Sequence, residues 1–179
     1  HIKISFAAVI IAIIVGGITG ILISHFQRTA KPTLAVINFL YTIPSISMLG
    51  FLIPFSGIGN ATAVIALTVY ALLPMVINTH TGLTNIDPLL VEAAEGMGST
   101  TLQTLVKIKI PLALPVIMSG IRSMTVMTIA LGGIASFIGA GGLGVAIYRG
   151  ITTNNSAMTM DGSLLIAFLA LTVDFLLGC

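Results

Sequence analysis

The stretch "VEAAEGMGSTTLQTLVKIKIPLALP", from Val91 to Pro115, carries an unusual share of the charge in this chain. The whole sequence of 179 residues has seven Lys and Arg and five Asp and Glu. This one passage contains Glu92, Glu95, Lys107 and Lys109. Because a charge is costly to bury without a partner, the passage must face water or another protein.

The composition around this passage excludes a soluble domain. Apolar residues make up 56% of the chain and charged residues 7%, with a mean hydropathy of +1.15. Soluble domains carry roughly 25% charged residues. The chain is therefore expected to span a membrane. Its few basic residues are scattered, so no patch could follow a nucleic-acid backbone.

Runs of about 20 apolar residues are long enough to cross a bilayer as helices. Five such runs occur in the sequence: Ser5–Ser24, Leu34–Phe55, Ala61–Thr79, Leu112–Ile138 and Gly162–Gly178. The predicted fold class is all-α, a polytopic transmembrane bundle of about five spans that forms one domain over residues 1–179. In the first span, Gly16 and Gly20 form a small-xxx-small pair that favours close packing of another helix.

The basic residues predict the orientation of the bundle. Arg28 and Lys31 lie in the first loop, and Lys107 and Lys109 lie in the third. Loops on the cytoplasmic side are enriched in Lys and Arg. We expect a multi-pass protein of the cell membrane, with the first and third loops and the C-terminus in the cytoplasm and the N-terminus outside.

The third loop, residues 84–111, is more than a linker. Asp87 followed by Pro88 is a helix start signal, since Asp accepts from free N–H groups and Pro suits the first helical position. Glu92 lies in the first half of that helix, where the dipole favours negative charge. Gly98 then ends the helix and allows a turn.

A second helix is predicted after the turn. Ser99 or Thr100 can cap its start, and Lys107 and Lys109 lie in its expected last turn. Pro111 is expected to stop this helix, and Pro115 to begin the next one. Since the loop lacks the broad basic face and aromatics of a membrane-surface helix, it is better suited to contact another protein.

The spacing of this loop resembles the signature "EAA, x3, G, x9, I-x-LP" of membrane subunits of binding-protein-dependent ABC importers. Ile110 in place of Leu is the one departure. The matching residues are Glu92, Ala93, Ala94, Gly98, Ile108 and Pro111. The resemblance implies a coupling helix within the cytoplasmic loop 84–111, which seats in a groove of an ATPase subunit.

Four further stretches are similar to permeases of osmoprotectant importers: "YTIPSISMLGFLIPFSGIGN", "INTHTGLTNIDPLLVEAA", "IPLALPVIMSGIR" and "IGAGGLGVAIYRGI". The implied substrate is glycine betaine, carnitine or choline. Methionine importer permeases share the plan, which leaves methionine or another amino-acid derivative as an alternative. The implied partners are a cytoplasmic ATPase that binds ATP and Mg, a second permease subunit, and an external binding protein or fused binding domain.

The second span contains a proline, Pro44, which is expected to kink it. A bent helix of this kind either lines a pathway or is an ordinary packing kink. The candidate pathway and gating residues are Tyr41, Thr42, Pro44, Ser45 and Arg122. Charges inside spans are costly, so Arg122 is expected to pair with Asp174, to line an inner vestibule, or to reach the interface.

Several other functions are disfavoured. "GAGGLG", with Gly139, Gly141 and Gly144, matches a dinucleotide motif in letters but lacks its strand–helix context, so a tight outer turn is expected there. No catalytic constellation, no metal-ligand spacing around the histidines and no ATP-binding loop is visible. A stand-alone channel or secondary transporter would predict inverted repeats, and none is seen.

Overall fold

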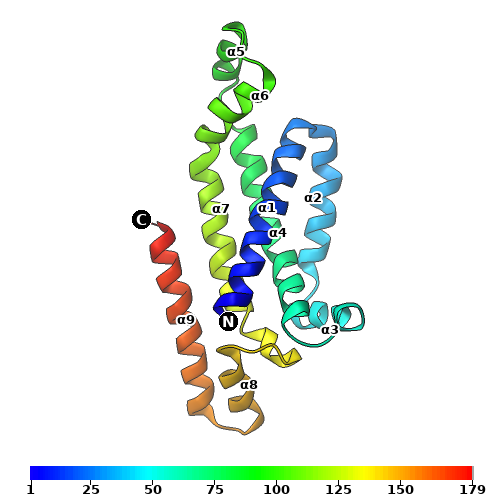
Figure 1. Cartoon of the computed structure of the whole chain (residues 1–179), viewed down its shortest axis with the longest axis vertical. Helices are drawn as coiled ribbons and strands as arrows, with labels where there is room; N and C mark the ends of the chain where they lie inside the picture. The colour runs from blue at the N-terminus through cyan, green and yellow to red at the C-terminus, as the bar shows by residue number, and fades with distance from the viewer. Residues whose placement is uncertain (179) are drawn as a thin grey trace.

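The computed structural model describes residues 1–178, which form an elongated helical bundle (Figure 1). The described part of the chain contains no strand. The elements, in chain order, are α1 (Ile2–His25), α2 (Gln27–Thr42), α3 (Ser45–Ser56), α4 (Asn60–Thr84), α5 (Pro88–Gly96), α6 (Thr101–Thr104), a π-helical segment (Leu105–Lys109), α7 (Ile110–Leu131), a 3₁₀ segment (Ile134–Ile138), α8 (Gly144–Thr152) and α9 (Ser156–Gly178). The all-α prediction is confirmed.

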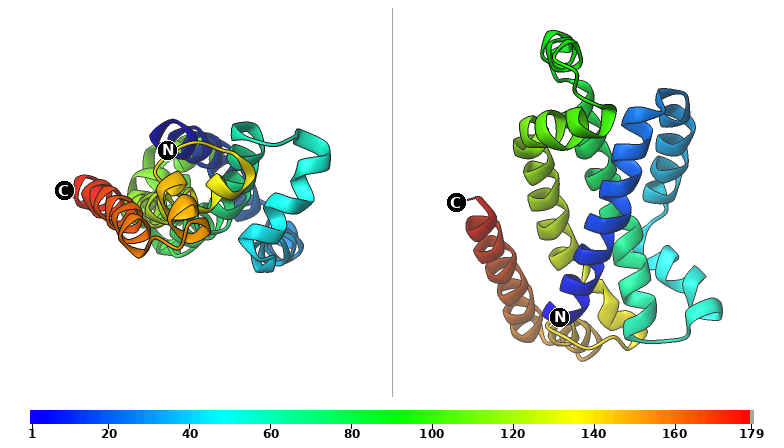
Figure 2. Two further views of the ribbon diagram at one scale, coloured as in Figure 1. Left: turned by 90° about the horizontal axis from the view of Figure 1, so that it is seen from below. Right: turned by 45° about the horizontal axis from the view of Figure 1, so that its top comes forward.

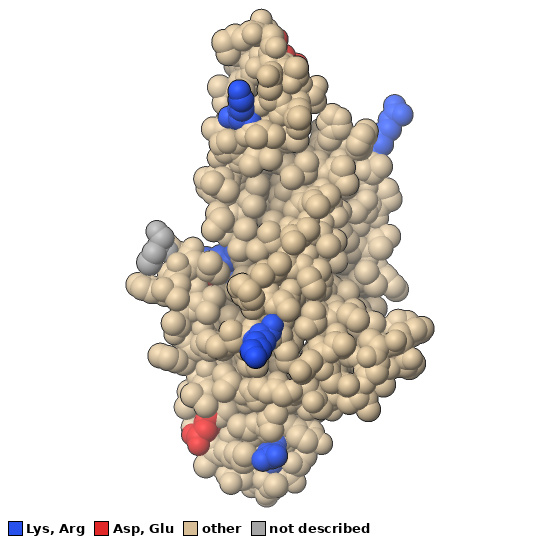
Figure 3. All heavy atoms as spheres, viewed as in Figure 1, with Lys and Arg blue, Asp and Glu red and all other residues tan. Residues whose placement is uncertain are grey.

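The core lies where α1, α4 and α7 pack side by side. Side chains of all three helices are fully buried there, among them Ala12, Val76 and Met124. Most other large apolar side chains remain exposed, and uncharged residues cover nearly all of the face seen in Figure 3. An outer surface this apolar fits lipid as the solvent. The chain is a multi-pass membrane protein.

The predicted count of spans holds, with one of them broken. Four helices are long and apolar enough to cross a membrane, and α2 with α3 forms a fifth candidate bent by 99°. Pro44 was expected to kink a continuous helix. That prediction is wrong, because Ile43 is extended and Pro44 precedes the first turn of α3 as its N-cap. Proline disfavours a helical residue before it, which separates α2 from α3.

The fourth and fifth spans differ from their predicted bounds. α7 ends at Leu131 rather than near Ile138, since Gly132 and Gly133 follow and glycine weakens a helix. The expected outer loop contains α8, and α9 begins at Ser156 rather than Gly162. Because α9 starts earlier, it is long enough to cross.

The glycine-rich turn has the predicted geometry. Gly139 has a left-handed φ of 73° and closes the 3₁₀ segment. A Cβ on Gly144 would lie 2.0 Å from the carbonyl oxygen of Gly133, so only glycine allows these two backbones to approach. The motif is a structural turn.

Gly16 and Gly20 bring α1 against α4. A Cβ on Gly20 would lie 2.5 Å from Cβ of Thr79, and one on Gly16 would lie 2.8 Å from Cγ of Met75. The packing interpretation of this pair is confirmed.

Replacing Gly20 with Leu is expected to destabilise the bundle by about 1–3 kcal/mol, because the added side chain forces α1 away from α4. Thermal unfolding of the purified protein in detergent measures the effect. Gly50→Ala is the control, since a Cβ there meets nothing within 4 Å and alanine favours a helix. Equal loss of stability in both variants would contradict the packing argument.

Candidate functional site

The loop 84–111 stands beyond the end of the bundle, with α5 as its outermost helix (Figure 2). α5 begins as predicted at Pro88. Asp87 is its N-cap, and its carboxylate oxygen Oδ1 accepts from the N–H of Leu89 at 2.9 Å. This bond satisfies one of the free donors of the first turn and fixes where α5 starts.

A glycine turn joins α5 to the second helix. Gly98 has a φ of +86°, which is strained for any side-chain-bearing residue. Thr100 then caps α6 through a capping box: its Oγ1 accepts from the N–H of Gln103 at 3.3 Å, and Oε1 of Gln103 accepts from the N–H of Thr100 at 2.9 Å. Of the two candidate caps, Thr100 rather than Ser99 has this role.

The expectation that Pro111 stops the second helix is wrong. A regular α-helix would bring the ring of Pro111 against the carbonyl of Lys107. The helix widens instead into a π-helical segment, in which the N–H of Ile110 donates to the carbonyl of Leu105, five residues back. The wider turn accommodates the proline, and the helical run continues from Thr101 to Leu131.

Two further expectations change with this one. Lys107 and Lys109 lie inside a continuing helical run rather than in a last turn, and Pro115 lies inside α7 rather than at its start. The favourable interaction of the two lysines with a helix end is therefore lost.

The outer face of the loop carries exposed apolar side chains. Leu89 is 69% exposed, Leu102 68% and Met97 82%, while Ala94 turns inward at 1%. The apolar side chains of the loop are thus divided between an inner and an outer side. Glu92 is exposed on the same helix. Large exposed apolar patches outside the lipid-facing surface are typical of sites that contact a partner.

The motif residues are distributed along this element. Glu92, Ala93 and Ala94 lie on α5, before the Gly98 turn, and two others follow it. Ile108, in the π-helical segment, is half-buried, and Pro111, in α7, is exposed. The motif spacing thus places its first and last parts on separate helices around one turn.

The break between α2 and α3 gathers four of the predicted pathway residues. Tyr41 stacks edge-on against Tyr70 of α4 at 5.9 Å between ring centroids, and its hydroxyl donates to Sδ of Met127 at 3.4 Å. The hydroxyl of Thr42 donates to the carbonyl of Phe39 at 2.7 Å. Pro44 and Ser45 follow at the bend itself.

Sequence reasoning missed one important residue at this break. The hydroxyl of Tyr70 donates to the carbonyl of Ile43, which would otherwise lack a partner at the bend. A buried carbonyl without a hydrogen bond is costly inside a membrane. No spacing signal points to Tyr70, because it comes from another span.

Arg122, the fifth predicted pathway residue, lies in a different environment from the four at the α2–α3 break. Its Nε donates to Oδ1 of Asp174 at 2.5 Å and its Nη2 to Oδ2 at 2.7 Å, a bidentate pair that joins α7 to α9. The predicted pairing is confirmed. A Cβ on Gly178 would lie 2.7 Å from Nη1 of Arg122, so a glycine at this point leaves room for the guanidinium.

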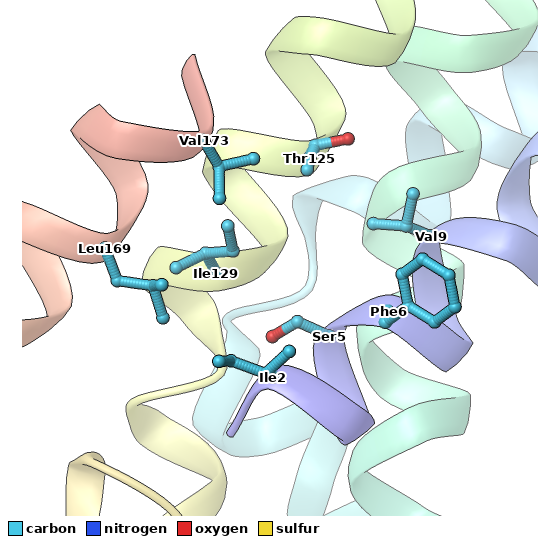
Figure 4. A pocket seen from close by; sticks show the side chains of 8 residues that line it. All are labelled: Ile2, Ser5, Phe6, Val9, Thr125, Ile129, Leu169 and Val173. Atoms are coloured by element: carbon cyan, nitrogen blue, oxygen red, sulfur yellow. The ribbon is translucent and has the colours of Figure 1, made fainter. Parts of the chain in front are cut away.

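An apolar cavity of about 150 Å³ lies between α1, α7 and α9 (Figure 4). Val173, one residue before Asp174, lines it, and Ser5 and Thr125 are its polar members. A cavity with this lining offers no charge to a polar solute. Among residues 1–178 no group of three His, Cys, Asp or Glu could hold a metal ion.

Comparisons with known proteins agree with this architecture. Residues 8–179 match the family "Binding-protein-dependent transport system inner membrane component". The chain is 43% identical over 178 residues to carnitine transport permease protein OpuCB of Listeria monocytogenes, covering 99% of this chain and 82% of the relative. It is 45% identical over 182 residues to osmoprotectant import permease protein OsmW of Salmonella typhimurium, with 99% and 85% covered.

A solved structure shares the fold over nearly the whole chain. An inward-facing structure of the MetNI methionine ABC transporter superposes with a TM-score of 0.87 at 25% identity, covering 99% of this chain and 89% of that one.

Proposed function

Because the chain belongs to the family of inner membrane components of binding-protein-dependent transport systems, we propose that it is the permease subunit of an ATP-driven importer of an osmoprotectant such as glycine betaine, carnitine or choline. It is a transport subunit and not an enzyme. The substrate is proposed from relatives that are 36–45% identical and are named for carnitine, choline, glycine betaine or osmoprotectant transport. The solved methionine transporter is less similar, at 25%.

The exposed loop 84–111 is the part of the chain that we propose couples it to an ATPase. α5 presents Leu89, Met97 and Glu92 outward, on a helix whose start is fixed by Asp87. We assign this surface to a cytoplasmic ATPase subunit, which binds ATP and Mg. The helical run from Thr101 to Leu131 is continuous, so a displacement of the loop is transmitted directly into a membrane span.

The orientation of the bundle in the membrane is proposed from the basic residues, which lie at one end of it. The α1–α2 turn, with Arg28 and Lys31 just after it, lies at the same end as α5 and α6 (Figure 1). Both basic loops therefore face the cytoplasm by the positive-inside rule, with the N-terminus outside. A second permease subunit completes the pathway, and an external binding protein or fused domain delivers the solute.

The bend between α2 and α3 is the proposed gating element. Tyr41, Thr42, Pro44 and Ser45 lie at a break where the hydroxyl of Tyr70, on another span, donates to the carbonyl of Ile43. Short breaks inside spans line cavities in transport proteins, because only there can irregular backbone be hydrated or paired. Arg122 is assigned to joining α7 and α9 rather than to contact with the solute.

Reconstitution tests the proposed function. The permease, co-expressed with the ATPase and binding protein of its system, is placed in liposomes, and uptake of radiolabelled glycine betaine, carnitine and choline is measured. Uptake should require ATP, the ATPase and the binding protein together. Uptake without ATPase would overturn the importer assignment, and uptake of methionine alone would overturn the substrate class.

A further inference from the structure

Two adjoining polar hollows lie beneath α5, where the loop 84–111 meets the rest of the bundle. Their volumes are about 250 Å³ and 270 Å³. Both are lined by Ser24, Gln27, Leu83 and Lys109, so Lys109 lies between them. The walls come from the α1–α2 turn, the end of α4, α5 and the helix that follows.

The walls carry opposite charges. Glu95 lines the first hollow and Glu92 the second, while Lys109 lines both. Among residues 1–178 the one ion pair within 4 Å joins Arg122 and Asp174, so neither glutamate is paired with Lys109. An ammonium and two carboxylates thus face a shared space without neutralising one another.

A buried hydroxyl adds a second, independent sign of a ligand. Thr104 lines the first hollow and is 2% exposed, yet its Oγ1 has no hydrogen-bond partner. Buried polar atoms are nearly always paired in folded proteins, and an unpaired one calls for a water or a ligand. Thr104 lies about one helical turn after the Thr100 cap, and its N–H donates to the carbonyl of Thr100 at 2.9 Å.

We propose that this space binds a small zwitterionic solute, with the solute's carboxylate at Lys109 and Thr104 and its cationic group at Glu95, which lines the same hollow. A simple anion would be repelled by the glutamates and a simple cation by the lysine, whereas a zwitterion matches both walls. The proposal rests on the proposed function, since a betaine-type solute is what the importer would release at this end.

Occupancy of the site has a consequence for transport. The solute would bridge α5 to the helical run that carries Lys109. A bound solute therefore favours one position of the loop, and solute accumulated in the cytoplasm slows further import. The size of the effect is set by how differently the two positions of the loop bind the solute.

Binding to the purified permease–ATPase complex, without binding protein, tests the site. Equilibrium binding of radiolabelled glycine betaine is compared for the unchanged chain and Lys109→Gln. Loss of a charge-assisted contact should weaken binding about tenfold or more. Lys107→Gln is the matched control, because Lys107 is two residues away and lines neither hollow.

A second variant distinguishes loss of the binding site from a folding defect. Thr104→Val removes a hydroxyl that has no partner in the protein, so it should leave stability unchanged or improved and still weaken binding. Choline, which has no carboxylate, and acetate, which has no cation, should both bind more weakly than glycine betaine. Equal binding of all three, or equal loss in Lys107→Gln and Lys109→Gln, overturns the proposal.

Measurements of uptake distinguish a failure of the zwitterion site from a failure of the proposed importer function. Initial ATP-driven uptake into vesicles should fall when they are preloaded with glycine betaine, and Lys109→Gln should relieve that inhibition. If the unchanged complex takes up no osmoprotectant, the proposed function fails. If uptake is normal but glycine betaine neither binds without binding protein nor inhibits from inside, only the zwitterion site is wrong and the hollows hold water.

Discussion

Arg122→Ala is expected to lower sharply the amount of folded protein in the membrane. The substitution leaves Asp174 charged and without its bidentate partner on a helix that crosses the membrane. Charges inside membrane spans are costly, so a carboxylate without its partner weakens the packing of α9 against α7. Thermal unfolding in detergent and the amount recovered from membranes measure the loss.

Charge exchange gives the sharpest check on the pair. Arg122→Asp combined with Asp174→Arg restores opposite charges across α7 and α9, so stability should recover relative to either single reversal. Arg149→Ala is the matched control, since Arg149 lies in the short helix α8 at the opposite end from α5 (Figure 1). A double exchange no more stable than the single variants would show that the pair contributes little.

Glu92→Lys is expected to abolish uptake without unfolding the chain. Glu92 is exposed and has no ion pair within the described residues, so its replacement breaks no salt bridge. On the surface assigned to the ATPase, a reversed charge meets groups arranged for a carboxylate, and such juxtaposition costs several kcal/mol. We expect at least a hundredfold fall in uptake, which corresponds to about 2.8 kcal/mol.

Three measurements separate this interpretation from a damaged helix. Co-purification of the ATPase should fall with Glu92→Lys, while circular dichroism and thermal unfolding of the permease alone should not change. Glu95→Lys places the same charge on α5 outside the motif, and because Glu95 lines the proposed zwitterion site, the two reversals are compared by ATPase co-purification rather than by uptake. Equal effects of the two reversals would mean that the charge of α5 acts through the helix dipole and not through a specific contact.

Local signals decided much of this structure. The apolar runs gave the all-α class and the spans, since 20 apolar residues have few other stable states in a bilayer. Asp87 with Pro88 placed the start of α5, and Gly98 placed the turn, because caps and left-handed residues act within a few positions of themselves. The cost of a charge in a span left pairing with Asp174 as one of three alternatives for Arg122, and the structure shows that the pair forms.

Other features depended on distant parts of the chain. Pro111 was expected to end a helix, yet a π-helical segment carries the helix past it. Pro44 was expected to kink a span, yet it begins a new helix whose preceding carbonyl is paired by Tyr70, on α4. At Pro44 the geometry depends on a partner from another span, whereas at Pro111 the wider turn accommodates the ring locally, so neither outcome could be predicted from the proline alone.

The sequence by itself determined that this chain is a helical membrane protein with one exposed, charged loop, because hydropathy, caps and turns act over one helix length. Only the tertiary structure decided which faces of that loop meet the bundle and which stay free. Ala94 turns inward while Leu89 and Met97 stay exposed, and Lys109 shares two hollows with Glu92 and Glu95 without pairing. Those arrangements arise where the α1–α2 turn, distant in sequence, meets the end of α4, α5 and the helix that follows, and their distances are fixed by mutual packing rather than by any local propensity.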